Sequence, residues 1–375
     1  MNIIAFYLPQ FHEIPENNAW WGKGFTEWVN MKKAAPLFDG HYQPRIPLNE
    51  NYYDLSDVNV MKWQASIAKA HGVTGFCFYH YWFGGKLLLE KPVENFLNDA
   101  TIDIDYCLSW ANETWTKAWA DKKDAVLIEQ DYGSEKEWAD HFRYFLPHFQ
   151  DKRYIKEEGK PLLVLYRPDL IPRLNDMLDY WNEMAIEAGF PGLVYAYQHV
   201  SFYLDDNRDD SRFTYHIEYQ PGYARALQDR NRSSRSWRHA VSQILIRTEK
   251  LLHTEIRANL PQEVKKYDYD MTWEYILNMK PDQKSLPGAF VDWDNTPRRQ
   301  NRGMVYIGAN PEKFKTYFSR LIRRTIDEYH KEYIFIFAWN EWAEGGYLEP
   351  DERYRYGYLE AIREALTENG LLLGE

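Results

Sequence analysis

Two glutamates three residues apart, in a stretch rich in tryptophan, form the sharpest candidate site in the sequence. Glu341 and Glu344 lie in WNEWAEGG (residues 339–346), directly after an apolar run that is typical of a buried strand. If the segment turns helically, their Cβ atoms lie about 5–6 Å apart on one face. That spacing favours glycoside chemistry with retention of configuration. The nearby indoles would raise the pKa of one carboxyl, which then acts as an acid, and leave the other ionised as base or nucleophile. The alternative is that both glutamates cap a helix or form ion pairs.

A second cluster, WANETW (residues 110–115), also follows a predicted strand. Asn112 and Glu113 could hydrogen-bond to sugar hydroxyls, while Trp110 and Trp115 could stack on a sugar ring. The alternative is that this loop only packs and caps a helix. In FYHYWF (residues 78–83), a histidine is more often structural than a base, and GFTEW (residues 24–28) could line a pocket or merely close the barrel.

Candidate sugar-binding residues therefore come from most strand ends and from the first long loop. They are Tyr7, Glu27, Trp28, His80, Tyr81, Trp110, Asn112, Glu113, Trp115, Arg167, His199, Asp292, Trp293, Asn340 and Trp342. We expect Tyr7, Trp28, Tyr81, Trp110, Trp115 and Trp293 to expose ring faces to one cleft.

Eight short apolar runs alternate with helix-length segments along the chain, and these elements must position the candidates. The runs cover residues 3–8, 74–79, 103–109, 162–166, 193–197, 213–219, 289–292 and 333–339. The helical patterns cover residues 57–71, 134–149, 169–188, 237–257, 311–330 and 351–367. This alternation indicates a parallel sheet covered on both faces, and eight units favour a (β/α)8 TIM barrel with catalytic groups at the carboxyl ends of its strands. We predict a single α/β domain over residues 1–375, with long loops after strands 1 and 6.

Composition excludes several classes of function. The 375 residues carry a net charge of −11, which disfavours a nucleic-acid partner. Aromatic residues make up 17%, and such surfaces suit flat, half-polar ligands such as sugars. With two cysteines, no leader and no apolar run long enough for a transmembrane segment, we expect a cytoplasmic protein. No P-loop, G-x-S-x-G, G-x-G-x-x-G, H-E-x-x-H or Cys/His cluster occurs, so we predict neither a metal nor a cofactor.

Long tryptophan-rich stretches from residue 5 to residue 351 carry a family resemblance. They are AFYLPQFH, WWGKGFTEW, HYQPR, GFCFYHYWFGGKLLLEKP, WANETWTKAW, VLYRP, VDWDNTPRR and FAWNEWAEGGYLEPD. The chain resembles WbsX-type proteins of bacterial polysaccharide gene clusters, which are related to glycoside hydrolase family 99, the endo-α-mannosidase and endo-α-mannanase barrels. In those hydrolases the first glutamate of N-E-W-x-E-G assists the substrate's own 2-hydroxyl, and the second protonates the leaving oxygen. The resemblance thus implies that Glu341 is the base and Glu344 the acid/base. Ala343 departs from the histidine of the hydrolases.

The resemblance implies a glycosyltransferase of O-antigen or capsule synthesis, and therefore of lipopolysaccharide or related surface glycans. A retaining endo-glycoside hydrolase of the family 99 type is the alternative, because one site can pass a glycosyl unit to water or to a hydroxyl. A catalytically silent glycan-binding barrel is the third reading. We expect a carbohydrate partner, either an oligosaccharide or an activated sugar, with possible peripheral contact to a lipid-linked glycan.

Two arginine groups follow strands 6 and 7 and suit phosphate, which a transferase would need. We name Arg235 and Arg298 as their candidate phosphate-binding residues. The alternative is a solvated helix face paired with acidic residues.

Overall fold

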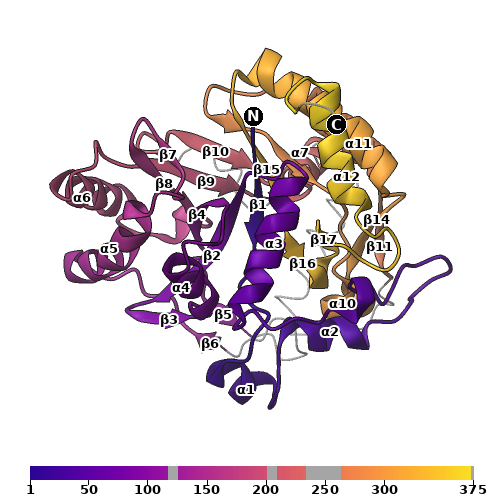
Figure 1. Cartoon of the computed structure of the whole chain (residues 1–375), viewed down its shortest axis with the longest axis horizontal. Coiled ribbons are helices and arrows are strands. Elements are labelled where there is room, and N and C mark those ends of the chain that lie inside the picture. The colour runs from indigo at the N-terminus through magenta and orange to yellow at the C-terminus, as the bar shows by residue number, and fades with distance from the viewer. Residues whose placement is uncertain (117–125, 201–208, 234–262, 373–375) are drawn as a thin grey trace, which may run out of the picture.

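The computed structural model describes residues 1–116, 126–200, 209–233 and 263–372. Nine parallel strands form a nearly closed barrel with helices around it (Figure 1). Around the barrel they are β12 (Ser285–Leu286), β10 (Tyr215–Glu218), β9 (Val194–His199), β8 (Lys160–Leu165), β4 (Asp105–Trp110), β2 (Gly75–Phe83), β1 (Asn2–Tyr7), β15 (Tyr333–Phe337) and β13 (Gly288–Phe290). Each of the eight predicted apolar runs overlaps one of these strands, so the predicted TIM barrel is confirmed.

The barrel closes through one segment that is split at Pro287. On one side of the proline, Ser285 pairs with His216 of β10; on the other, Gly288 pairs with Phe335 of β15. Proline has no N–H to donate, but its carbonyl accepts a hydrogen bond from the Phe335 N–H (3.0 Å). A Cβ at position 288 would lie 1.8 Å from the Glu218 carbonyl oxygen, so the close approach requires glycine. The sequence predicted only the second half of this segment.

Amphipathic helices cover the outside of the barrel (Figure 1). They are α3 (Val58–Ala70), α4 (Lys91–Asn98), α5 (Glu135–Gln150), α6 (Leu174–Glu187), α7 (Gly222–Ser233), α9 (Tyr269–Asn278), α11 (Pro311–Arg324) and α12 (Gly357–Glu368). Five of the predicted helices are confirmed, with bounds that differ by a few residues. The end of the predicted 311–330 helix is a π-helical turn, Thr325–Tyr329. The predicted helix at 237–257 lies outside the described residues.

Strand alternation divides the side chains of β2 between two environments. All nine of its residues are buried, as expected for a strand covered on both faces. Tyr79 points into the barrel, where its hydroxyl lies 3.0 Å from that of Tyr219 on the opposite side. Phe78 instead packs on Phe96 of α4. Successive residues of a strand alternate in this way, so His80 faces the helices and Tyr81 faces the barrel mouth.

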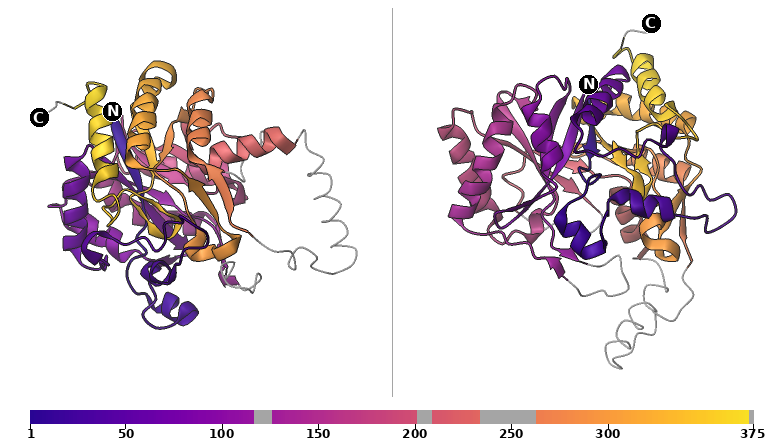
Figure 2. Two further views of the ribbon diagram at one scale, coloured as in Figure 1. Left: turned by 90° about the vertical axis from the view of Figure 1, so that its right-hand side faces the viewer. Right: turned by 60° about the horizontal axis from the view of Figure 1, so that its bottom comes forward.

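Three short helices lie at the end of the barrel where the parallel strands end. They are α1 (Pro15–Trp21) and α2 (Glu27–Lys33) from the first long loop, and α10 (Thr296–Arg299) after β13. Figures 1 and 2 show α2 beside α10 at this end, while the start of β1 and the end of α12 lie at the other. The first long loop therefore brings its side chains to the end of the barrel where the Glu341 and Glu344 segment was predicted to lie.

Candidate active site

The two candidate catalytic glutamates lie on a tight hairpin at the carboxyl end of β15. Strand β16 (Asn340–Glu341) pairs antiparallel with β17 (Gly346–Tyr347), and a 3₁₀ turn, Trp342–Glu344, joins them. Gly345 has φ 66°, which glycine adopts without strain. A Cβ at position 346 would lie 2.2 Å from the Phe337 ring. The two glycines thus permit the turn that presents Glu341 and Glu344 together. We call this segment, residues 340–347, the catalytic hairpin, after the candidate role of its two glutamates.

Both glutamates bind one arginine. Arg298 Nη2 lies 2.9 Å from Glu341, and its Nη1 lies 3.0 Å from Glu344. The same guanidinium contacts Glu27 of α2 at 3.1 Å. The four side chains are only 7–14% exposed. We call these four residues the carboxylate cluster.

Three carboxylates facing one guanidinium leave excess negative charge when all are ionised, and burial makes this costly. Burial raises the pKa of Glu341 to about 8; Arg298 opposes the rise, while Glu344 and Glu27 add to it. Burial disfavours the charge of Arg298, but its three carboxylate neighbours raise its pKa and keep it protonated. Glu341 therefore holds a proton more tightly than an ordinary glutamate. Once ionised it is a correspondingly stronger base.

Tyrosines at or just after the ends of three barrel strands lie near the carboxylate cluster. The Tyr81 hydroxyl accepts a hydrogen bond from Gln10 Nε2 (2.8 Å); burial raises its pKa, and the charges of Glu341 and Glu27 contribute. Burial likewise raises the pKa values of Tyr166 and Tyr219, with a contribution from Glu344. Tyr79 and Tyr166 were not among the predicted site residues. The alternation of inward and outward positions at the strand ends was the signal that could have found Tyr79.

Three predicted sugar contacts face the helices instead, and their prediction is wrong. Tyr7 is fully buried, and its hydroxyl donates to Gln64 Oε1 of α3 (2.6 Å). His80 lies 2.8 Å from His141 of α5, between the barrel and that helix. Trp110 is buried, and its Nε1 donates to the Trp82 carbonyl. All three occupy the outward register of their strands, where a sugar in the barrel mouth cannot reach them.

Three more candidates hold the catalytic hairpin in place and are too buried to be sugar platforms. Asn340 accepts a hydrogen bond from the Leu8 N–H (2.8 Å) and donates one to its carbonyl (3.0 Å). Trp342 stacks on Tyr347 at 3.7 Å. Trp28 is also buried, and its Nε1 donates to the Tyr53 carbonyl. These residues fix the backbone that carries Glu341 and Glu344.

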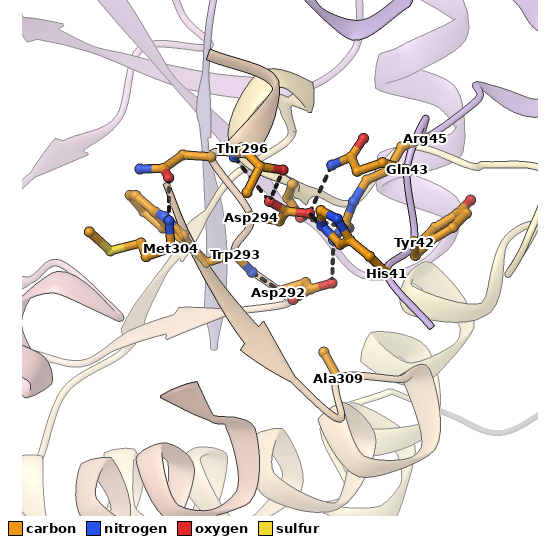
Figure 3. Close-up of polar contacts among 12 residues, drawn as sticks. His41, Tyr42, Gln43, Arg45, Asp292, Trp293, Asp294, Thr296, Met304 and Ala309 are labelled. Atoms are coloured by element: carbon orange, nitrogen blue, oxygen red, sulfur yellow. Dashed lines mark hydrogen bonds and ion pairs between the residues drawn. The ribbon is translucent and has the colours of Figure 1, made fainter. Parts of the chain in front are cut away.

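A buried ion-pair network joins the first long loop to the segment after β13 (Figure 3). Asp292 pairs with Arg45 at 2.8 Å, so it is engaged by protein and does not act as the predicted sugar contact. Asp294 accepts hydrogen bonds from Gln43 and Thr296 and lies 2.8 Å from His41. Burial alone would raise the pKa of Asp294, but His41, Arg45 and the hydrogen-bond donors hold it below its usual value.

The same network reaches the catalytic hairpin. The Asp294 N–H donates to the Glu344 carbonyl (2.7 Å), and Arg45 Nη1 donates to the Gly345 carbonyl (3.3 Å). Because α10 begins two residues after Asp294, this network sets the position of Arg298 relative to the hairpin.

The remaining candidates are half-buried, except for the buried Asn112, and several lie beside the mouth. Trp115 packs edge-on against Tyr81, and Trp293 stacks on Phe337. The Trp293 indole N–H is buried and has no acceptor among the described residues. Glu113 and Arg167 form an ion pair, and the Asn112 side chain bonds to the backbone of Arg167 (2.7 Å).

His199 is the last residue of β9, and its ring packs on Tyr223 of α7. Of the two predicted phosphate ligands, Arg298 points at three carboxylates, which corrects its assignment, and Arg235 lies outside the described residues.

No described helix combines the length and apolarity that a membrane crossing demands.

The fold and parts of the sequence match known proteins. The GH99 endo-alpha-mannosidase from Bacteroides thetaiotaomicron superposes with a TM-score of 0.56 at 13% identity, covering 98% of this chain and 97% of that one. A glycoside hydrolase-like protein superposes with a TM-score of 0.53 at 12% identity, covering 97% and 93%. At these identities the likeness shows the fold.

Two other proteins share a higher sequence identity with this chain than these solved structures do. The uncharacterized protein WxcX of Xanthomonas campestris pv. campestris (strain ATCC 33913) is 35% identical over 372 residues, which are 97% of this chain. The same-named protein of strain B100 is 34% identical. The chain spans about half the length of these relatives (49%). The family described as Glycosyltransferase WbsX matches residues 3–362, and the chain belongs to this family.

Proposed function

We propose that this protein is a retaining glycosyl-transfer enzyme of bacterial surface polysaccharide biosynthesis, with Glu341 and Glu344 as its catalytic pair. Family membership and fold support a glycan-active enzyme. The observation that carries the proposal is the placement of both carboxylates on one hairpin at the carboxyl end of the barrel, bound to the two terminal nitrogens of Arg298. A site that only binds glycans has no need of two buried carboxylates on one arginine.

In the proposed first step, ionised Glu341 removes the proton of the donor sugar's 2-hydroxyl. The 2-oxygen attacks C1 and the bond from C1 to the leaving oxygen breaks, while Glu344 gives its proton to that oxygen. In the second step, the acceptor hydroxyl attacks C1 and the bond from C1 to the 2-oxygen breaks, while Glu344 takes the acceptor's proton and Glu341 returns a proton to the 2-oxygen. Two inversions at C1 give retention.

The raised pKa of Glu341 supports its role as the base, because deprotonating a sugar hydroxyl needs a strong proton acceptor. Arg298 acts as a positioning residue that holds both carboxylates and favours the ionised form of Glu341. The predicted candidates that remain proposed substrate contacts are Tyr81, Glu113, Trp115, Arg167, His199 and Trp293. They are joined by Tyr79, Tyr166 and Tyr219. The buried, unpaired indole N–H of Trp293 supports the assignment of this residue as a substrate contact, because a sugar hydroxyl could accept its hydrogen bond.

We place the reaction in the cytoplasm, with peripheral contact to a lipid-linked glycan. The free, buried cysteines Cys77 and Cys107 support a reducing compartment. Hydrolysis is the second candidate, because the described fold superposes on a family 99 endo-alpha-mannosidase over nearly its whole length.

The deciding experiment offers the protein two kinds of donor, with and without acceptor glycans: nucleotide-activated or lipid-linked sugars, and neutral oligosaccharides. A retained linkage to the acceptor, lost in Glu341→Gln and Glu344→Gln, supports the transferase. Release of free sugar from an oligosaccharide without acceptor supports the hydrolase. Glycan binding with no turnover in either assay would favour the silent binding barrel.

A further inference from the structure

A cavity of about 520 Å³ lies between the first long loop, α3 and the segment that follows the catalytic hairpin. Its walls include Trp342 of the hairpin and Glu349, but no member of the carboxylate cluster. The volume falls within the range of about 300–1,000 Å³ that small-molecule sites occupy. The cavity is therefore separate from the candidate catalytic site, although both use the same hairpin.

Aromatic rings form much of the cavity wall. Tyr52, Tyr53, Trp63, Trp342 and Tyr356 line it. Tyr52, Trp63 and Tyr356 are only half-buried, so part of their ring surface remains uncovered. Such rings offer flat apolar faces beside polar edges, which suits the C–H face of a pyranose.

Amide and carboxyl groups form the rim. Asn49, Glu50 and Asn51 are exposed there, and their side chains can accept or donate hydrogen bonds to hydroxyl groups. Among the described residues that line the cavity, none is a lysine, arginine or histidine. An anionic ligand such as a phosphate or a uronate would meet the carboxyl groups of Glu50 and Glu349 and no cationic side chain in this lining, so the lining favours a neutral ligand.

The rim is held in an uncommon backbone conformation. Asn49 and Glu50 are consecutive, and both have positive φ, 57° and 53°. Left-handed geometry is tolerated by asparagine but is rare for glutamate. Hydrogen bonds to residues 350–352 of the same chain hold this backbone conformation. The Asn49 N–H donates to Glu352 (2.6 Å), and the Leu48 N–H donates to the Pro350 carbonyl (2.9 Å). Strain that the surroundings maintain in this way clusters at ligand sites.

The cavity floor is fixed by a buried carboxylate. Both oxygens of Glu349 accept two hydrogen bonds each, from Gln64 (2.6 Å) and Trp339 (3.1 Å), and from Tyr53 (2.7 Å) and Trp342 (2.6 Å). Two of these donors, Tyr53 and Trp342, are cavity walls, so their rings are held in place before any ligand arrives. A preformed wall lowers the cost of ordering the site on binding.

From these observations we propose that the cavity is a saccharide-binding site for a neutral pyranose unit of a glycan, separate from the catalytic site. The half-buried rings of Tyr52, Trp63 and Tyr356 stack on the sugar ring. The rim of Asn49, Glu50 and Asn51 hydrogen-bonds to its hydroxyls. The inference goes beyond the proposed transferase activity and does not depend on it, because binding can be measured in an inactive variant.

The test uses ¹⁹F NMR of protein labelled with 5-fluorotryptophan, in which Trp63→Phe assigns the Trp63 signal. The probes are a neutral mannose trisaccharide, a neutral rhamnose trisaccharide and, as an anion, guanosine diphosphate. We expect at least one trisaccharide to shift the Trp63 signal at millimolar concentration, equally in wild type and in Glu341→Gln, while guanosine diphosphate does not. A Trp63 signal that neither trisaccharide moves, or that guanosine diphosphate moves as much, overturns the proposal.

A second variant keeps the fold and removes the rim. Asn49→Gly deletes the amide and relieves the left-handed backbone, so its thermal midpoint should equal or exceed that of wild type while trisaccharide affinity at Trp63 falls about tenfold. Tyr180→Ala removes a half-buried ring on α6 and should leave affinity unchanged. Wild-type affinity in Asn49→Gly would overturn the role of the rim. A shifted Trp63 signal without any turnover would sustain this site and count against the proposed catalysis alone.

Discussion

Nη2 of Arg298 lies 2.9 Å from Oε1 of Glu341, and both side chains are about nine-tenths buried or more. Burial disfavours the ionised carboxylate, and the arginine favours it. The protonation of the proposed base thus depends on a residue from another loop, 43 positions earlier in the chain. Several testable consequences start from this pair and from the elements that hold it.

Replacing Arg298 should move the pH dependence of turnover. In Arg298→Ala, the Glu341 carboxyl loses the charge that lowers its pKa, so the pKa should rise above about 8. The acidic limb of the kcat/KM profile should shift to higher pH, and the rate at pH 7 should fall about tenfold or more. Arg298→Lys keeps a charge without the fork and should shift the limb less. An unmoved limb in Arg298→Ala would show that Arg298 does not set the protonation of Glu341.

Removing either carboxyl should abolish most turnover without unfolding the protein. Glu341→Gln and Glu344→Gln should each lower kcat by about a hundredfold or more, the usual size of lost general acid–base catalysis. Steady-state kinetics with the identified donor measures this, and circular dichroism checks the fold. Glu332→Gln, an exposed glutamate just before β15, is the matched control and should keep the wild-type rate. A wild-type rate in either catalytic variant would refute the role given to that residue.

The ionisation of Glu341 should also make the free energy of unfolding depend on pH. Its pKa is about 8 in the folded protein, against an ordinary value of 4.5, so the folded state binds the proton more tightly than the unfolded chain. The stability that this group contributes is fully present below about pH 4.5 and is lost as the pH rises through 8. Glu341→Gln cannot ionise. The free energy of unfolding of the variant minus that of wild type should therefore increase between these limits, as urea titrations at several pH values would show. A difference that stays flat with pH would contradict the raised pKa.

The pair Arg45 and Asp292 should behave as a structural ion pair. Asp292→Asn removes the nearer of the two carboxylates beside the buried Arg45 guanidinium, while Asp294 remains 3.9 Å away. The substitution should destabilise the protein by about 3 kcal/mol, measured by chemical denaturation. Replacing both residues, in Arg45→Met with Asp292→Leu, should cost less than Asp292→Asn alone. If Asp292→Asn kept full stability and lost only affinity for sugar, Asp292 would return to the list of substrate contacts.

Two tyrosines on opposite faces of barrel strands give a matched comparison. Tyr219 faces the mouth, and Tyr219→Phe should lower kcat/KM about three- to tenfold with little change in stability. Tyr7 faces α3, and Tyr7→Phe leaves Gln64 Oε1 unpaired, so it should lose about 1–3 kcal/mol of stability and keep its kinetics. The reverse pattern would mean that the two residues have been assigned to the wrong faces.

The barrel could be predicted from sequence because each strand is a short apolar run, and such runs need burial on both faces. Placing Glu341 and Glu344 at its carboxyl end followed from their position directly after the last run. The side chains that contact sugar were harder to predict from the sequence. His80 and Trp110 looked like sugar contacts because they stand at strand ends, but a one-residue difference in register turns each of them toward the helices. Tyr79, next to His80, faces the barrel interior, but the strand-end pattern alone did not predict it as a contact, because the pattern does not give the register.

Arg298 could not be understood from its own neighbourhood in the sequence. Its local pattern, TPRR, suggests an exposed basic turn, and the carboxylates that engage it come from positions 27, 341 and 344. Glu27 is 271 residues away, and the network around Asp294 helps to join its loop to the segment that carries α10. Pairings of this kind depend on tertiary structure and leave no local periodicity.

The pairing of β1 with both β2 and β15 has a consequence for how the chain is made. Asn2 to Ala5 align with residues 333–336, so β1 finds its second neighbour only after those residues have been synthesised. Until then, β1 has one unpaired edge, and contacts that span so much of the chain form slowly. A ribosome-bound chain that stops before residue 333 should therefore expose a strand edge that the finished barrel hides, and chaperones that bind extended segments would recognise it there.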